Sequence, residues 1–232
     1  MVDTPVFVLF GKSHLLTLAL IVAVCISMGR VARSENVTRL AWLLAVLLMA
    51  QEAVKLYVFI GLYGQDWKHS MPLDLCRMNE FVCAFMLVRR SYPAFQVAYF
   101  WALGGSVSAL LTPDLAYGFP DPRFLLFFFG HGLAVVAVFY AVFGFGFWPR
   151  LRSVGITLLV SSAYAVIVAG MNQLLDTNFL FLRAKPESAS VLDLLGPWPI
   201  YLFGLFGLAI VICLLCYAPF ALARRWCTRL AR

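Results

Sequence analysis

The chain has 232 residues, of which 63% are hydrophobic and only 12% are charged, and its mean hydropathy is +0.90. Soluble domains are about half apolar and about a quarter charged, so this composition excludes a soluble globular protein and indicates an integral membrane protein. The formal net charge of +7 requires no nucleic-acid partner, because most of the cations flank apolar segments and are explained by membrane orientation.

Along the chain, apolar segments of about 20 residues recur, which is the length that crosses a membrane as a helix. The first is expected to be retained rather than cleaved, because one Lys precedes it, three Arg follow it, and no small-residue cleavage site stands out. We therefore expect an all-α, seven-transmembrane-helix bundle that forms a single membrane domain over residues 1–232. The predicted spans are 13–29, 40–63, 71–88, 94–112, 124–147, 154–175 and 197–219.

The charged residues that flank these segments predict how the bundle is oriented. One set of loops carries mostly arginines, and the opposite set carries most of the acids. Cytoplasmic loops carry an excess of Lys and Arg, so we expect the N-terminus outside and the C-terminus in the cytoplasm. The predicted cytoplasmic cations are Arg30, Arg33, Arg39, Arg89, Arg90, Arg150, Arg152, Arg224, Arg225, Arg229 and Arg232, and their acidic neighbour is Glu35.

The cysteines do not predict a disulfide framework, because none lies in an external loop, where a stable bridge would be expected. The C-x-x-C spacing at 213–216 falls in a leucine-rich helix, so we expect neither a metal site nor a cofactor. Cys227 follows the last span, and the cysteines within predicted spans are Cys25, Cys76, Cys83, Cys213 and Cys216.

The informative residues are the polar ones inside the spans, since ionisable groups in lipid are costly and usually face the bundle interior. At about 1.5 Å per residue, Cys76, His131 and Asn172 lie at a similar depth below the outer ends of their helices. This predicts a polar pocket that opens toward the outside. The other polar residues inside the predicted spans are Gln51, Glu52, Lys55, Asp74, Arg77, Asn79, Glu80 and Gln173.

Helical phase divides the polar residues of segment 71–88 into two faces. Asn79, Glu80 and Cys83 share an arc of about 100° with Cys76, so we expect them to line the same cavity. Asp74 and Arg77 point the other way at i,i+3 spacing, which favours a local ion pair. Glu52 and Lys55, on the preceding span, have the same spacing and favour a neutralising pair.

Each candidate also has a structural interpretation. A buried Cys is usually an inert small hydrophobe, and a lone His in a span is more often a hydrogen-bonding group between helices. Two further histidines suggest no chemistry, because His14 suits a capping role and His69 an interfacial one. If the helix begins near Pro72, however, its dipole favours a thiolate at Cys76, and a nearby imidazole favours it further.

Four motifs together resemble a known family. The pattern H-x-x-P-L-x-x-C runs from His69 to Cys76, and "FFFGHG" ends at Gly132. The chain then has "MNQLLDTNFLFLRAKP" at 171–186 and "LDLLGPWPIY" at 192–201. This combination resembles the YwaF family of bacterial membrane proteins, which is related to the eukaryotic transmembrane-protein-164 acyltransferases, and the similarity covers nearly the whole chain.

The resemblance implies a multi-pass protein of the bacterial cytoplasmic (inner) membrane with an intramembrane Cys/His pair. The eukaryotic relatives look like thiol-dependent lipid acyltransferases, so Cys76 would be the nucleophile and His131 the general base. The family motif usually reads P-L-H-x-C, and this chain has Asp74 in place of that His. If that His is the essential base of the family, His69 or His131 would have to substitute for it, or the chain would not be an enzyme.

Two classes of function are compatible with the sequence, with a sensory or partner subunit as a third. The first is thiol-dependent acyl transfer to, or hydrolysis of, a membrane lipid, with Asn172 or a backbone N–H near the start of the helix stabilising the oxyanion. The second is a binding protein or transporter for a small polar solute. The residues expected to contact substrate or solute are Glu52, Lys55, Asp74, Arg77, Asn79, Glu80, Asn172, Trp198 and Tyr201. Membrane lipid is the expected partner of the enzyme.

Overall fold

The computed structural model describes residues 5–31, 37–185 and 191–230, and these residues are helical apart from connecting segments and one isolated bridge between Val6 and Tyr117. Three of the charged residues that predict the orientation, Arg33, Glu35 and Arg232, lie outside the described residues. Six helices in the described part are long and apolar enough to cross a membrane, so the prediction of an all-α polytopic protein is confirmed.

Six of the seven predicted spans correspond to these helices within a few residues, except that α9 continues 11 residues past the predicted end at 219. Two of them contain a π-helical turn: α2 continues into η1, and α5 continues through η2 into α6. The helices are α1 (Lys12–Val31), α2 (Val37–Leu56) with η1 (Tyr57–Leu62), α5 (Tyr92–Trp101) with η2 (Ala102–Ser106) and α6 (Val107–Leu111), α7 (Pro122–Gly144), α8 (Leu151–Leu175) and α9 (Ile200–Leu230).

The predicted third span, 71–88, is shorter than expected. It forms α4 (Leu75–Arg89), whose 15 residues reach about 22 Å, against about 30 Å for the hydrocarbon core of a bilayer. The helix cannot begin at residue 71, because Pro72 disfavours helical dihedrals in the residue before it. Met71 is accordingly extended, with φ −61° and ψ 143°. The shorter elements α3 (Trp67–Ser70), η3 (Phe179–Phe181) and η4 (Val191–Leu195) lie in the connections.

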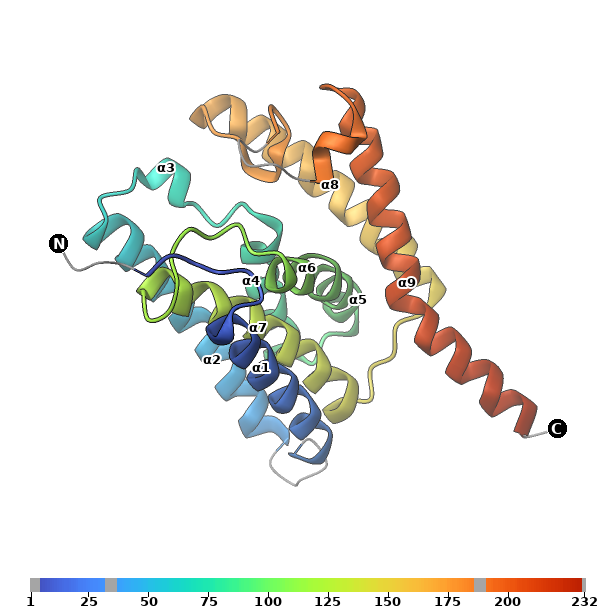
Figure 1. The fold of residues 1–232 in the computed structure, drawn as a ribbon. Coiled ribbons are helices and arrows are strands. Elements are labelled where there is room, and N and C mark those ends of the chain that lie inside the picture. The colour runs from blue at the N-terminus through green and yellow to red at the C-terminus, as the bar shows by residue number, and fades with distance from the viewer. Residues whose placement is uncertain (1–4, 32–36, 186–190, 231–232) are drawn as a thin grey trace.

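α4 lies at the centre of the helix packing. It contacts α2, α5 and α7, while α7 also packs against α1 and α2. α8 packs against α5 and α9 packs against α8, so these two helices lie on the opposite side of the molecule from α1 and α2 (Figure 1). The first turn of α4, residues 75–78, is half-buried among these helices.

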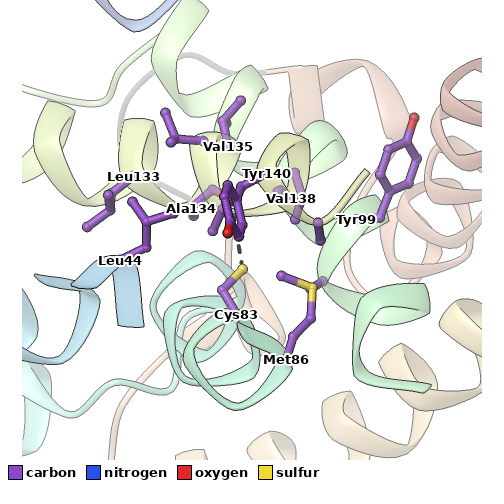
Figure 2. Close-up of a cluster of buried hydrophobic side chains, with 14 of the residues drawn as sticks. Leu44, Cys83, Met86, Tyr99, Leu133, Ala134, Val135, Val138 and Tyr140 are labelled. Carbon is purple, nitrogen blue, oxygen red and sulfur yellow. Dashed lines mark hydrogen bonds between the residues drawn. The ribbon is translucent and has the colours of Figure 1, made fainter. Parts of the chain in front are cut away.

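The apolar core locks α4 against its neighbours. Figure 2 shows Cys83 and Met86 of α4 packed among Leu44 of α2 and Ala134 and Tyr140 of α7. All five side chains are buried. The Cys83 Sγ atom lies 4.0 Å from the carbonyl oxygen of Ala134, so this cysteine is part of the α4–α7 contact.

Candidate functional site

A cavity of about 530 Å³ lies at the start of α4. Its wall is formed by the end of α2 and η1, the segment 69–77, the connection 114–117, the first part of α7 and the turn at Phe181. The residues predicted from sequence that line it are Lys55, Asp74, Cys76, Arg77 and His131, together with His69. The proposed nucleophile and the proposed base therefore border one cavity, although they are 55 residues apart in sequence.

Cys76 is the second residue of α4 and is half-buried. Its thiol packs on Gly105 of η2, where an added Cβ would lie 3.2 Å from Sγ. The glycine therefore makes the room that the sulfur occupies. A permanent thiolate is poorly solvated in such an enclosed position, so reaction at Cys76 requires a nearby base that removes the proton as attack occurs.

His131 has the tautomer that such a base needs. Its Nδ1 atom lies 2.8 Å from the carbonyl oxygen of Phe127. A carbonyl only accepts, so Nδ1 carries the hydrogen and Nε2 of the neutral ring is left as an acceptor. The ring packs on Phe127 with centroids 4.3 Å apart, which holds its orientation. Within the described residues, Nε2 has no hydrogen-bond partner.

The glycines on either side of His131 explain how α7 approaches its neighbours. An added Cβ on Gly130 would lie 2.7 Å from both Gln51 Nε2 and Glu80 Oε1, and one on Gly132 would lie 2.9 Å from Ile21. Both distances are below any normal contact. The motif "GHG" therefore lets α1, α2 and α4 pack against α7 while the intervening His131 reaches the cavity.

The buried charges behind this wall form a network between α2 and α4. Lys55 Nζ lies 3.5 Å from Glu52 and 3.6 Å from Glu80. Arg77 donates from Nε to Glu52 Oε1 at 2.7 Å and also from Nη2 to the same oxygen. Gln51 donates to Glu80. The network holds two cations and two carboxylates, so its formal charges cancel, as buried charges require.

The expected Glu52–Lys55 pair is present, but the expected Asp74–Arg77 pair is not. Arg77 bonds to Glu52 of α2 instead, because that carboxylate is buried and needs a counter-charge, whereas Asp74 is exposed. Its Nη1 atom also donates to the carbonyl oxygens of Ser70 and Met71, at 2.7 and 3.1 Å. Arg77 thereby fixes the segment that leads into α4.

Three residues expected beside Cys76 lie elsewhere. Asn79, Glu80 and Cys83 do share its face of α4, but they are not among the residues that line the cavity. Deeper in the bundle this face meets other helices: Glu80 meets α2 and Cys83 meets α7. Asn79 is fully buried, and neither polar atom of its side chain has a hydrogen-bond partner in the described part of the chain.

Three other predicted contacts support the cavity wall from behind. Asn172 Nδ2 donates to the Phe179 carbonyl at 2.9 Å, and its Oδ1 accepts from the Phe179 N–H at 2.8 Å. Trp198 Nε1 donates to Leu182 O at 3.1 Å, and the Tyr201 hydroxyl donates to the carbonyl of Phe181. These bonds shape the turn that places Phe181 in the wall. None of the three predicted residues lines the cavity itself.

Sequence reasoning missed the part of the cavity wall formed by the connections before α7 and by the start of α7. Arg123 lies over the rings of Tyr63 and Tyr117, which come from separate connections, and Asp114 and Phe127 also line the cavity. Arg123 pairs with Asp121, the N-cap of α7, and this guanidinium lowers the pKa of the Asp121 carboxyl below its usual value. The aromatic residues of these connections were the available signal.

Comparison with known protein families identifies the TMEM164 family, whose model matches residues 9–217. The matched range includes the cavity and all of the candidate residues. No curated protein and no solved structure matches the chain.

Proposed function

Because the chain belongs to the TMEM164 family, a membrane family linked to acyltransferase activity, we propose that it is an intramembrane, thiol-dependent lipid acyltransferase with Cys76 as nucleophile and His131 as general base. The observation that carries this proposal is that both side chains border one cavity, with Nε2 of His131 left as an acceptor. Hydrolysis of the acyl ester is the same chemistry with water as the acceptor.

The reaction has two halves. In the first, Sγ of Cys76 attacks the ester carbonyl of a lipid while Nε2 of His131 takes the thiol proton. The C–O bond then breaks, the proton passes to the leaving alcohol oxygen, and the acyl group remains as a thioester. In the second half, an acceptor hydroxyl attacks the thioester, gives its proton to His131, and the thiol is restored with that proton.

The oxyanion of each tetrahedral intermediate needs hydrogen-bond donors. Asn172, the side chain considered from sequence, already bonds to the outer turn and lies outside the cavity wall. The first turn of α4 offers an alternative, because helix N-termini have backbone N–H groups without helical acceptors. Asp74 makes no side-chain bond to these groups. We assign the oxyanion role to the N–H groups around Cys76.

The remaining parts of the proposal concern the membrane. α4 acts as the seventh membrane segment, inserted among α2, α5 and α7 rather than crossing alone. The asymmetry of the arginines favours an N-terminus outside and a C-terminus in the cytoplasm of a bacterial cell. The cavity then lies in the outer leaflet, where lipid ester groups are found. Lys55, Asp74 and Arg77 would contact the polar part of the substrate.

A solute transporter would use the same cavity differently. A transporter of an anionic solute would need unpaired cations that face the cavity, whereas Lys55 and Arg77 both pair with Glu52. Asp74, which lines the cavity without an ion pair in the described residues, would suit only a cationic solute. The pairing favours the enzyme, because the cations then serve to hold the wall in place.

The test compares the lipid profiles of cells that express equal amounts of wild type or Cys76→Ser. The Ser variant should fold but lose acyl transfer, since an alcohol is a much weaker nucleophile than a thiol at neutral pH. A thiol-directed acyl probe should label wild type at Cys76 only. Cys216→Ser is the matched control, because Cys216 is also half-buried but lies on α9, away from the cavity. Unchanged lipid profiles in Cys76→Ser, with intact solute uptake, would favour the transporter.

A further inference from the structure

A second hollow of about 610 Å³ lies on the outside of the bundle, between α2 and α4. We call it the α2–α4 groove. Its walls are almost entirely apolar, with Trp42, Val46 and Met49 on α2 and Phe81 and Phe85 on α4. It shares no lining residue with the cavity of Cys76.

The groove runs along the two helices rather than across them. Its lining residues on α2 extend from Trp42 to Ala50, and on α4 from Phe81 to Arg89. Eight helical steps correspond to about 12 Å. One leaflet of the hydrocarbon core is about 15 Å deep, half of about 30 Å. The groove therefore matches the depth of one acyl chain in a single leaflet.

Two cations stand at one end of the groove. Arg89 belongs to its lining, and Arg39 lies three residues before Trp42, on the same face of α2. Both side chains are exposed. Neither makes a hydrogen bond or ion pair within residues 5–31, 37–185 and 191–230, in contrast to Arg90, which donates to Thr38. Trp42 lies at the same end of the groove, and Trp is typical of the membrane interface.

We propose that the α2–α4 groove binds one anionic diacyl phospholipid of the leaflet at this end of the helices. Its phosphate lies between Arg39 and Arg89, and one acyl chain lies along the apolar wall. The two arginines determine the specificity: an apolar groove alone would accept any lipid, whereas guanidinium groups at its mouth without a partner in the described part of the chain select negative charge. The site is independent of the proposed acyl transfer.

The test measures lipid binding to the full-length protein. Delipidated protein in detergent is titrated with phosphatidylglycerol or with phosphatidylcholine of the same acyl chains, and bound lipid is counted by native mass spectrometry. We expect one phosphatidylglycerol to bind preferentially, with about a fivefold preference for each arginine. Arg89→Gln should reduce the preference about fivefold. Arg152→Gln, an exposed cation on α8, should leave it unchanged.

A second variant tests the apolar wall without changing charge. Ala50 is exposed and lines the groove, so Ala50→Phe should fill it and weaken phosphatidylglycerol binding while the elution volume stays that of wild type. Equal affinity of wild type for the two lipids would overturn the proposal, as would equal effects of Arg89→Gln and Arg152→Gln. So would a wild-type dimer that Ala50→Phe converts to a monomer, because the groove would then be an interface between copies.

Discussion

Gly130 is a position where an added methyl group should disturb the contacts between α7, α2 and α4. Its missing Cβ leaves the space in which Gln51 of α2 bonds to Glu80 of α4. In Gly130→Ala, the methyl carbon would lie 2.7 Å from both Gln51 Nε2 and Glu80 Oε1. The ends of both side chains would have to move away from the methyl group, which would disturb the hydrogen bond between them.

The size of the loss can be worked from these contacts. Overpacking a closely packed interior costs about 1–3 kcal/mol, and a buried hydrogen bond to a charged group contributes about 1.5–3 kcal/mol. The Gln51–Glu80 bond is buried between helices. The clashing atoms are the ends of flexible side chains, so we expect Gly130→Ala to lower the free energy of unfolding by about 1–3 kcal/mol.

The assay is equilibrium unfolding in mixed micelles with increasing sodium dodecyl sulfate, followed by loss of helix. Gly155→Ala is the matched control, since Gly155 is also helical and nothing lies within 4 Å of an added Cβ there. In a helix this exchange is neutral or stabilises by about 0.5–1 kcal/mol. If Gly130→Ala and Gly155→Ala unfold at the same detergent concentration, the close approach of α7 to α2 and α4 is refuted.

Three further outcomes are expected. His131→Ala should lower acyl turnover by about 10²-fold or more without changing the unfolding midpoint greatly; unchanged turnover would remove His131 from the mechanism. Arg123 lowers the pKa of the Asp121 carboxyl in the folded protein. The stability that this pair contributes is therefore fully present above the ordinary Asp pKa of about 4. It is lost as the pH falls through the lower pKa that Asp121 has in the folded state. The melting temperature of wild type should therefore fall in that acidic range, and a curve for Asp121→Asn with the same slope would contradict this. Asn172→Ala should speed trypsin cleavage after Arg183, since the turn at Phe179 loses both hydrogen bonds to the Asn172 amide. Gln173→Ala, at an exposed neighbouring position, is the control. Equal cleavage rates of the two variants would show that the Asn172 amide does not hold the turn.

Features that depend on local composition could be predicted from the sequence alone. Six of the predicted spans are helices of sufficient length and apolarity, because a bilayer imposes its thickness on any segment that crosses it. The polar residues inside those spans also predict a candidate site, since charges in lipid are costly and are placed where they have partners. Two of the predicted residues, Cys76 and His131, border one cavity, and their catalytic roles stay a prediction.

The tertiary structure decided which partner each polar group takes. Helical phase placed Asn79, Glu80 and Cys83 on the face of Cys76 correctly, but phase does not reveal which helix that face meets at each depth. Helical spacing likewise did not predict the ion pair of Arg77, which bonds to Glu52, 25 residues away in sequence, rather than to the nearby Asp74. Sequence spacing predicted the Glu52–Lys55 pair, which forms within α2. Arg77 instead pairs across helices, and only the packing of α2 against α4 determines that its guanidinium meets Glu52.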